Sequence, residues 1–421
     1  MRLDRRNLLR CYGKVISVII FIYLLFFIFA YAQKTTQQQD KSSRDTKDKM
    51  VVGGDEGFFR KYYTRFKGNA YVEKGSTRML AEVIEYFETN NFAIGRGDVV
   101  LKDSKSGINV FGQYSEYYGN SNIIIFYNNP YLVITNDGIF LKGEVLILNQ
   151  NDESVVSRTN AYMSNANIQM FSDNIIVLSK SNIIRLVRNS KVISSNITIH
   201  SDRGVIITSS NKKAKENEIS QYIGIGRVLI IGSNFSLSSD NIVINFTNNE
   251  VKDYTATGNV VISNTNNIVM AEYFRSEFEG GRDVFHIGMT NVVITNLENG
   301  DTVYSDYLFA DKNNNYELLS GNATYVIDNG RTRIKAQTIE RFLDISITML
   351  NKDVVIDSEN ISMMSEIGKY DEKMRTIQLI GNPRVVNEDR MGVSANVITI
   401  NINKRQVKID NGNYGYVIPG M

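Results

Sequence analysis

The sequence has few of the residues on which enzymes and disulfide-stabilised proteins depend. Its 421 residues include one cysteine, three prolines, two histidines and no tryptophan. Cys11 lies before an apolar run near the N-terminus, so the rest of the chain can form no disulfide bond. Scarce proline permits long uninterrupted strands, because proline cannot donate to a β-ladder. The net charge of +2 provides no strong field, so we do not expect a dedicated nucleic-acid binder.

Recognisable catalytic motifs are also missing. The two histidines, His200 and His286, lie far apart in unlike contexts, and the sequence shows no Ser-His-Asp, H-E-x-x-H, P-loop or C-x-x-C pattern. Gly224 and Gly226 do not form a dinucleotide fingerprint, because no helix is expected after them. We therefore predict no catalytic residues, no metal site and no cofactor, and we predict that the chain is not an enzyme.

The N-terminus has the composition of a targeting segment. Five basic residues precede an apolar run over residues 15–30, and Ala30-Tyr31-Ala32 matches an A-x-A cleavage site. Residues 1–32 are predicted to be a signal peptide or an uncleaved membrane anchor; the run is shorter than the ~20 residues that a spanning helix prefers. Residues 33–53 are polar and aperiodic and are predicted to be a disordered linker. Either reading exports the rest of the chain.

A short block of small, polar, Val, Val and Ile residues recurs along the exported part. It is clearest at 258–262, and further copies begin at residues 68, 97, 226, 290, 321, 352 and 381. A period of about 31 residues is typical of a stacked repeat architecture. Degenerate units near 159 and 190, and one beginning at Asn128, bring the expected total to about eleven.

Each unit is predicted to contain two strands, the first of which begins with the block. Pairs of a small residue followed by an acid or amide come after most blocks, as in Ala81-Glu82 and Ser239-Asp240, and are expected to open the second strand. Asn-Asn and Asp-Asn-Gly clusters between alternating runs predict hairpin turns. Residues 77–90 have some helical pattern, but their place in the repeat favours a strand. We expect repeats over residues 54–210 and 221–410, a loop insertion at 211–220, and a C-terminal tail at 411–421.

Period-two alternation within the block predicts which side chains face inward. Counting the first residue as zero, positions +2 and +4 are aliphatic, whereas +1 and +5 are polar. The inward-facing candidates for an apolar groove are Val99, Leu101, Val228, Ile230, Val260, Ile262, Val292, Ile294, Val354 and Ile356. This aliphatic stripe is compatible either with an ordinary closed core or with an interior that opens to an apolar ligand.

The repeats resemble the OstA-like domains of lipopolysaccharide transport. The resemblance is carried by Thr257-Gly258-Asn259-Val260-Val261-Ile262 and by Ile380-Gly381-Asn382-Pro383-Arg384-Val385-Val386 followed by Ser394-Ala395-Asn396. This family includes the periplasmic bridge protein LptA, its anchored partner LptC and the periplasmic domain of LptD. It implies an elongated antiparallel β-jellyroll whose apolar inner faces hold acyl chains and whose edge strands pair with other jellyrolls. The chain departs from it in being longer than a typical bridge protein and in lacking the membrane barrel of LptD.

We therefore predict an all-β, periplasmic lipid-binding scaffold in lipopolysaccharide or lipooligosaccharide transport, contacting the membrane only through residues 1–32 if they are uncleaved. The alternative is a structural or adhesive β-solenoid surface protein, and a third class is a carbohydrate-active enzyme on a parallel β-helix. Strand pairing separates these predictions, because a jellyroll is antiparallel and solenoid coils are parallel.

Overall fold

The computed structural model describes residues 50–416 except 75, 105–106, 136–137, 150, 195–196, 209–218, 248–249, 328–329, 359–360, 388–390, 405 and 411–412. The chain divides into an N-terminal unit that ends at Gly224 and a C-terminal unit that begins at Ile225. Over the described residues the regular structure is β, apart from the short 3₁₀ segments η2 (Glu88–Asn90) and η3 (Ser179–Ser181). Within that part of the chain, no helix is long and apolar enough to cross a membrane.

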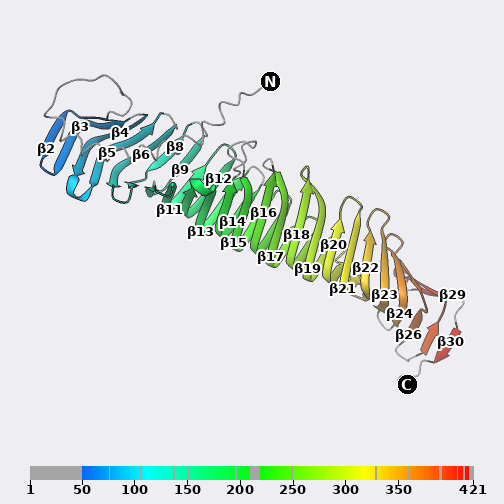
Figure 1. Cartoon of the computed structure of the whole chain (residues 1–421). Helices are drawn as coiled ribbons and strands as arrows, with labels where there is room; N and C mark the ends of the chain where they lie inside the picture. The colour runs from blue at the N-terminus through cyan, green and yellow to red at the C-terminus, as the bar shows by residue number, and fades with distance from the viewer. Residues whose placement is uncertain are drawn as a thin grey trace, which may run out of the picture. The chain divides into compact units, whose positions relative to one another are not determined.

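Most strands of the N-terminal unit pair with the strands that precede and follow them in the chain (Figure 1). They are β1 (Met50–Gly53), β2 (Glu56–Arg60), β3 (Tyr63–Lys74), β4 (Thr77–Phe87), β5 (Phe92–Asp103), β6 (Ile108–Tyr118), β7 (Ile123–Tyr127), β8 (Tyr131–Ile134), β9 (Ile139–Lys142), β10 (Val145–Asn149), β11 (Ser154–Ser164), β12 (Ile168–Leu178), β13 (Ile183–Ser194) and β14 (Thr198–Thr208). The boundary with the second unit falls within β15 (Ile219–Ile231).

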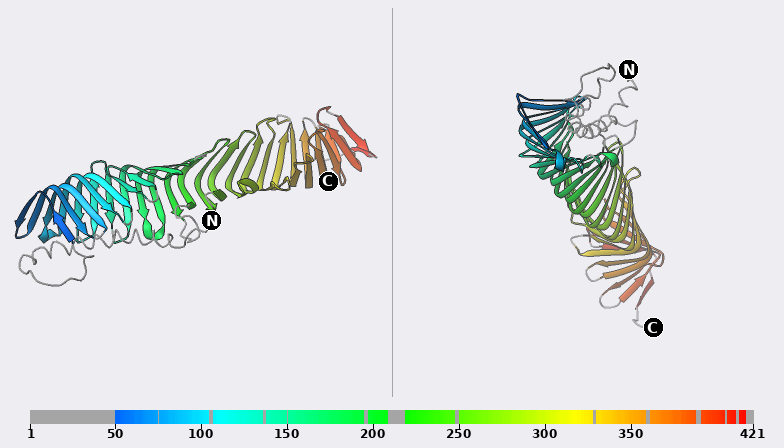
Figure 2. Two further views of the ribbon diagram at one scale, coloured as in Figure 1. Left: turned by 90° about the horizontal axis from the view of Figure 1, so that it is seen from above. Right: turned by 60° about the vertical axis from the view of Figure 1, so that its left-hand side comes forward.

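The C-terminal unit repeats this arrangement. Its strands are β16 (Phe235–Thr247), β17 (Glu250–Asn264), β18 (Asn267–Glu279), β19 (Arg282–Asn296), β20 (Thr302–Asp311), β21 (Tyr316–Ile327), β22 (Thr332–Phe342), β23 (Ile347–Ser358), β24 (Ile361–Asp371), β25 (Thr376–Ile380), β26 (Arg384–Asn387), β27 (Met391–Ser394), β28 (Val397–Asn401), β29 (Gln406–Asp410) and β30 (Asn413–Tyr416). Two further views show the strands of each unit stacked side by side (Figure 2).

Strand pairing is antiparallel throughout the described ladders. Within the C-terminal unit, for example, β21 pairs with β22 and β22 pairs with β23, each in antiparallel register. The predicted antiparallel β-jellyroll of two-strand repeats is therefore confirmed. The parallel coils required by the solenoid and β-helix alternatives are absent from the described ladders, so both of those scaffolds are contradicted.

A double left-handed bulge bends one strand of every repeat. Apart from Gly280-Gly281 in the turn after β18, eleven pairs of consecutive described residues have positive φ, and Gly258 (φ 75°) with Asn259 (φ 49°) is typical. The pairs begin at residues 68, 97, 128, 159, 188, 226, 258, 290, 321, 352 and 381. The ladder skips at most of them, as between Ser320 and Ala323 where β21 pairs with β22. Glycine and asparagine suit the left-handed conformation best, which explains the recurring Gly-Asn. The predicted total of about eleven units is confirmed.

The bend at each bulge, here called the corner, creates two layers. The part of a strand before its corner, such as residues 316–320, lies in the first layer, and the part after it, such as residues 323–327, lies in the second. Inner faces of the two layers contact each other: the guanidinium of Arg341 in the first layer lies 5.7 Å from the ring centroid of Tyr325 in the second. The layers meet at the corners, and their opposite edges, where the strands end, are here called the mouth.

The position of the block within its strand corrects one prediction. The Gly-Asn block was expected to begin the first strand of a unit, and the small-acidic pair was expected to open the second. Instead, Gly258 lies in the middle of β17 and Ala271-Glu272 in the middle of β18. The sequence signal was read as a strand boundary because positive φ usually accompanies turns, whereas a bulge keeps the strand continuous through the bend.

Strand boundaries elsewhere refine the predicted segments. Residues 77–90 form strand β4 followed by η2, as their place in the repeat predicted. Met50–Gly53 forms β1, inside the predicted linker, because Val52 pairs with Val72 and extends the ladder by one strand. Asn413–Tyr416 forms β30, inside the predicted tail, and pairs with β27. The predicted signal peptide or anchor (1–32), most of the linker and most of the 211–220 insertion lie outside the described residues.

Candidate lipid-binding interior and its mouth

The corners are held by a repeated polar contact between neighbouring units. Asn322 Nδ2 donates to Asp306 Oδ2 over 3.4 Å, and Asn382 Nδ2 donates to Glu366 Oε1 over 3.1 Å. The same geometry joins Asn69 to Asp55, Asn160 to Glu144, Asn189 to Asp173 and Asn259 to Asp240. In these six cases the acid therefore binds the next corner along the array. These acids have a structural role.

Where the small residue beside the acid is serine, its hydroxyl donates to a backbone carbonyl near the bulge. Ser239 Oγ donates to the carbonyl of Asn241 over 3.0 Å, and Ser305 Oγ donates to the carbonyl of Tyr307 over 3.1 Å. Both serines are buried, at 5% and 6% exposure. A carbonyl that the bulge removes from the ladder is satisfied in this way, which avoids leaving a backbone polar group unpaired.

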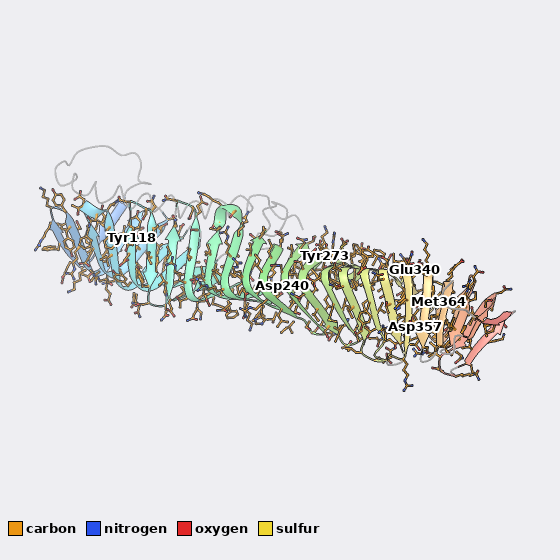
Figure 3. The ribbon with its side chains drawn as sticks, turned by 90° about the horizontal axis from the view of Figure 1, so that it is seen from below. Tyr118, Asp240, Tyr273, Glu340, Asp357 and Met364 are labelled. Atoms are coloured by element: carbon orange, nitrogen blue, oxygen red, sulfur yellow. The ribbon has the colours of Figure 1, made fainter. Side chains whose placement is uncertain are left out.

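The predicted inner face of the block is buried along both units. Eight of the ten candidates are at most 4% exposed: Val99, Leu101, Val228, Ile230, Val260, Val292, Val354 and Ile356. Ile262 and Ile294, nearer the mouth, are half-buried. The intervening outer positions carry exposed or half-buried side chains, such as Met364 at 48% exposure, and Asp240 projects from an outer position at a corner (Figure 3). The alternation read from the sequence therefore places these residues between the layers.

The interior is filled mainly by its own apolar side chains. In the N-terminal unit a cavity of about 30 Å³ remains between the layers. Its lining comes from both layers: Val72, Met79 and Leu101 from the second, and Ile84, Ala93, Ile94, Gly95, Ser115, Tyr117, Ile124 and Phe126 from the first. A space of this size is comparable to one water molecule and is too small for an acyl chain. An apolar chain would therefore enter only if the layers separate at the mouth.

The mouth of each unit is closed by side chains rather than by strand pairing. In these ladders, segments of the first layer pair only with segments of the first layer and segments of the second only with the second, and no described ladder joins the two edges of the mouth. In the N-terminal unit, the inner row next to the mouth is largely apolar and pairs across successive strands. That row consists of Thr64, Tyr86, Ala93, Tyr117, Ile124, Leu148, Val155, Val177, Ile184 and Ile206.

The same row has a different chemistry in the C-terminal unit. The paired residues there are Tyr254, Ser276, His286, Ala310, Glu317, Arg341, Thr348 and Tyr370. Arg341 Nη1 donates to Glu317 Oε2 over 2.9 Å, and its Nε donates to Glu372 Oε1 over 3.4 Å. Thr348 Oγ1 donates to the same Glu372 oxygen over 2.7 Å. Titratable groups therefore line this mouth.

The electrostatics of Arg341 follow from this environment. Its side chain is 18% exposed, and that of Glu317 is 13% exposed. Burial alone would lower the pKa of the guanidinium, but Glu317, Tyr325 and Glu372 outweigh that effect and hold the pKa above its usual value. Arg341 therefore stays charged, and the two carboxylates balance a cation that would otherwise be costly to bury.

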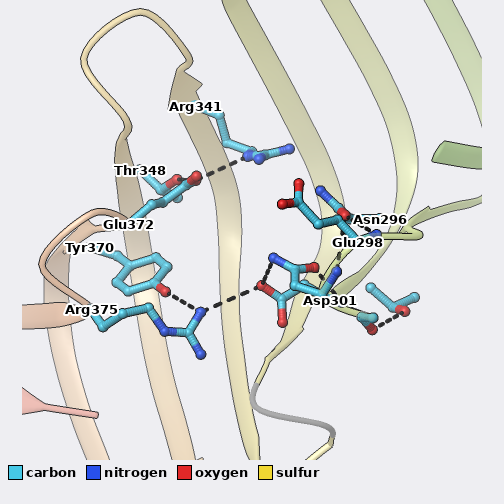
Figure 4. Close-up of polar contacts among 11 residues, drawn as sticks. Asn296, Glu298, Asp301, Arg341, Thr348, Tyr370, Glu372 and Arg375 are labelled. Atoms are coloured by element: carbon cyan, nitrogen blue, oxygen red, sulfur yellow. Dashed lines mark hydrogen bonds and ion pairs between the residues drawn. The ribbon is translucent and has the colours of Figure 1, made fainter. Parts of the chain in front are cut away.

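A second group of contacts spans the two edges of this mouth (Figure 4). Arg375, in the turn after β24, belongs to the first layer, and Asp301, just before β20, belongs to the second. Arg375 Nη1 donates to the hydroxyl of Tyr370 over 3.0 Å and lies 3.6 Å from Asp301 Oδ2. Asp301 is 5% exposed and Tyr370 is 1% exposed. The rings of Tyr325 and Tyr370 also meet edge to face, with centroids 6.1 Å apart.

His286 belongs to a hydrogen-bonded trio at the same mouth. Its Nδ1 lies 2.9 Å from Ser276 Oγ, and its Nε2 lies 3.0 Å from Asp283 Oδ2. The sequence showed no such grouping, because Ser276 and Asp283 belong to different strands. Ser276 is fully buried, and its hydroxyl also donates to Asp283 Oδ1 over 3.0 Å. A hydroxyl that is committed to a carboxylate and inaccessible to substrate is poorly placed as a nucleophile.

A carboxylate surrounded by tyrosines lies on the outer face of the N-terminal unit. Glu116 accepts hydrogen bonds from the hydroxyls of Tyr114 (2.9 Å), Tyr118 (2.7 Å) and Tyr127 (3.0 Å). Burial alone would raise the pKa of Glu116, but these three donors outweigh it and lower the pKa. The hydrogen bond to Glu116 in turn raises the pKa of Tyr118 to about 12.

Sequence reasoning placed the inner aliphatic residues but missed the polar residues at the mouth. Arg341 lies on the inner side of β22, in phase with the buried Ile339. A charged residue at an inward position is a detectable signal. The alternation predicted for a block extends only to its position +5, however, and the corner changes the phase of the alternation in each strand. Asp301 and Arg375 lie in turns, where no periodicity could assign them.

Comparison with known proteins gives little further information. No protein-family model matches the chain, and no curated protein matches it. Among solved structures, it is similar to LptH, the LptA homologous periplasmic component of the lipopolysaccharide transport device from Pseudomonas aeruginosa. The identity is 13%, the match covers 26% of this chain and 82% of LptH, and the TM-score is 0.24. A likeness of this level carries no argument about function, which is therefore inferred from the chain's own geometry.

Proposed function

We propose that this protein is a periplasmic lipid-binding scaffold that carries lipopolysaccharide or lipooligosaccharide towards the outer membrane. The observation that supports it is the two-layer interior, in which the +2 and +4 positions of successive repeats form one apolar lining. Acyl chains would lie between the layers, and head groups would remain outside. Sheltering apolar surface from water contributes about 25 cal/mol per Å², which is the physical reason for such a carrier.

The proposed role requires no chemistry from this chain. Catalysis is not part of the proposal, and directional movement would be driven by an energy source elsewhere. The proposed partners are the lipid and other jellyroll transport proteins. These would pair with exposed edge strands such as β2, where main-chain groups on one side have no strand partner in the described ladders. Export would depend on residues 1–32.

Site-specific photocrosslinking tests the proposal directly. The most informative positions are Ile262 and Ile294, because they face inward and are half-buried. Their matched controls are Val261 and Val293, which are adjacent in the chain, also half-buried, and face outward. A photoreactive residue at the two inner positions should capture lipopolysaccharide, whereas the outer pair should not. Equal capture from both faces, or no capture at any of the four, would reject lipid binding between the layers.

A further inference from the structure

The two units differ in how their mouths are held closed. In the N-terminal unit the inner row of the first layer beside the mouth is largely apolar. In the C-terminal unit, residues from opposite edges are joined by an ion pair and by aromatic and cation–π contacts. Loading of the interior requires the layers to separate, so these polar contacts would have to break first in the second unit.

We propose that Asp301, Tyr325, Arg341, Tyr370 and Arg375 form a clasp that holds the mouth of the C-terminal unit closed and limits the entry of acyl chains there. The identity of what enters rests on the proposed function. The clasp itself is a property of the lipid-free protein. Asp301 and Tyr325 belong to the second layer, and the other three belong to the first.

The central element of the clasp is a single nitrogen atom. Arg375 Nη1 contacts Tyr370 OH at 3.0 Å on its own layer and Asp301 Oδ2 at 3.6 Å on the other. Asp301 is held in place by Asn299, whose Nδ2 donates to the same Oδ2 over 2.9 Å. Its backbone carbonyl also accepts from the amide of Asn296 over 2.9 Å. Asp301 is therefore held by residues of its own layer, and its carboxylate also contacts Arg375 on the other layer.

Partial burial of the clasp residues reduces the screening of their ion pair by salt. The side chains of Arg375 and Asp301 are 24% and 5% exposed, so salt screens this pair less than it would screen a surface ion pair. The second crossing contact places the Arg341 guanidinium over the ring of Tyr325, and carboxylates on the Arg341 side keep that cation charged. Opening the mouth would expose two cations and separate one of them from its carboxylate.

The test measures the width of the mouth and the uptake of lipid separately. Leu297 and Met374 are 49% and 67% exposed and lie in the two turns that carry Asp301 and Arg375. Nitroxide labels on Leu297→Cys and Met374→Cys, in the full chain with Cys11→Ser, report the distance across the mouth without lipid. Asp301→Asn and Arg375→Gln should broaden this distribution toward longer distances. Arg375→Lys should restore much of the narrow distribution, because an ammonium can take the place of Nη1.

Arg333→Gln is the matched control, because it removes one positive charge from an exposed outer position of β22. Lipopolysaccharide capture from a photoreactive residue at Ile294 should be about threefold to tenfold faster in the two clasp variants, which corresponds to loss of a partly buried ion pair. Capture at Ile84, in the N-terminal unit, should be unchanged. Unchanged distances in both clasp variants would overturn the clasp, and wider distances without faster capture would overturn its control of entry.

Absence of lipid binding and absence of the clasp give different results in these measurements. If no position in either unit captures lipid, the proposed function fails, while the distance measurement still decides whether the clasp exists. Tyr370→Phe provides a second variant that preserves packing volume and removes only the hydroxyl that accepts from Arg375. It should widen the distance distribution less than Asp301→Asn does, because the ion pair remains.

Discussion

Asn259 Nδ2 donates to Asp240 Oδ2 over 3.1 Å, and the Asp240 side chain occupies the space in which a Cβ on Gly258 would lie. This relationship joins two consecutive repeats, because Asp240 follows a small residue in one unit and Gly258-Asn259 is the corner of the next. It explains why glycine precedes asparagine in the clearest blocks. The corner needs left-handed backbone at two positions, and the neighbouring carboxylate leaves no room for a side chain at the first.

Substitution of this glycine should destabilise the C-terminal unit. Gly258→Ala places a Cβ against Asp240 at φ 75°, and both the clash and the left-handed strain oppose folding. We expect a loss of roughly 2–3 kcal/mol, measured by urea denaturation. Gly280→Ala is the control, because Gly280 has φ 57° with nothing within 4 Å of the new Cβ, and it should cost about 1 kcal/mol. Equal losses at both positions would show that the carboxylate contact is unimportant.

The two adjacent valines of one block should respond very differently to the same change. Val260 is 1% exposed between the layers, whereas Val261 is half-buried on the outer face. Val260→Ala should lower the free energy of unfolding by roughly 2 kcal/mol, since it removes buried methyl groups and leaves a cavity. Val261→Ala should cost well under half as much. The urea midpoints of the two variants provide the measurement, and a larger effect at Val261 would contradict the assigned faces.

Stability of the N-terminal unit should depend on pH through Glu116 and Tyr118. The pKa of Glu116 is lowered below 4.5 in the folded state, so its contribution is present above pH 4.5 and is lost as pH falls through the folded pKa. The pKa of Tyr118 is raised from 10.0 to about 12, so its contribution is present below pH 10 and is lost as pH rises toward 12.

Thermal unfolding across both pH ranges measures this dependence, and Glu116→Gln is the diagnostic variant. Loss of the carboxylate should flatten the profile on the acid side and also between pH 10 and 12, because the Tyr118 shift arises chiefly from its hydrogen bond to Glu116. Tyr62→Phe is the control, since that tyrosine is 50% exposed and remote from Glu116 in the chain. A variant profile as steep as the wild-type profile at both ends would contradict the assignment.

Ser276 should be unreactive despite its contact with His286. A fluorophosphonate probe should leave the folded protein unlabelled, because the Ser276 hydroxyl is fully buried and donates to Asp283. Mass spectrometry of the treated protein, with Ser276→Ala for comparison, provides the measurement. Labelling that disappears in the Ser276→Ala variant would contradict the proposal that the chain does no chemistry.

Much of the fold could be predicted because the same pattern of hydrophobic alternation recurs in successive repeats. Alternation at Val99 and Leu101 has the same phase as at Val354 and Ile356, so one inward face could be assigned in both units. The strand at 77–90 was assigned correctly for the same reason, since its place in the period outweighed a weak helical pattern. The corner was misplaced as a strand boundary, because a left-handed Gly-Asn pair looks alike in a turn and in a bulge.

The mouth of the C-terminal unit could not be predicted from the same reasoning. Asp301 and Arg375 are 74 positions apart in the chain, and neither belongs to the repeating block. Their contact depends on how the turns of one layer face the turns of the other. Hydrophobic alternation carries no information about turn residues, because their side chains are not constrained by the period of a strand.

The amino-acid sequence alone determined the β repeats, the inward aliphatic stripe and the number of units, because these follow from backbone preferences and side-chain alternation that act within a few residues. Only the tertiary structure decided that each block bends a strand at its middle and that an acid of one unit accepts a hydrogen bond from the corner of the next. The same is true of the charged side chains that contact each other across the mouth of the C-terminal unit. These features depend on the distance and direction between segments that are remote in the chain, which local preferences do not specify.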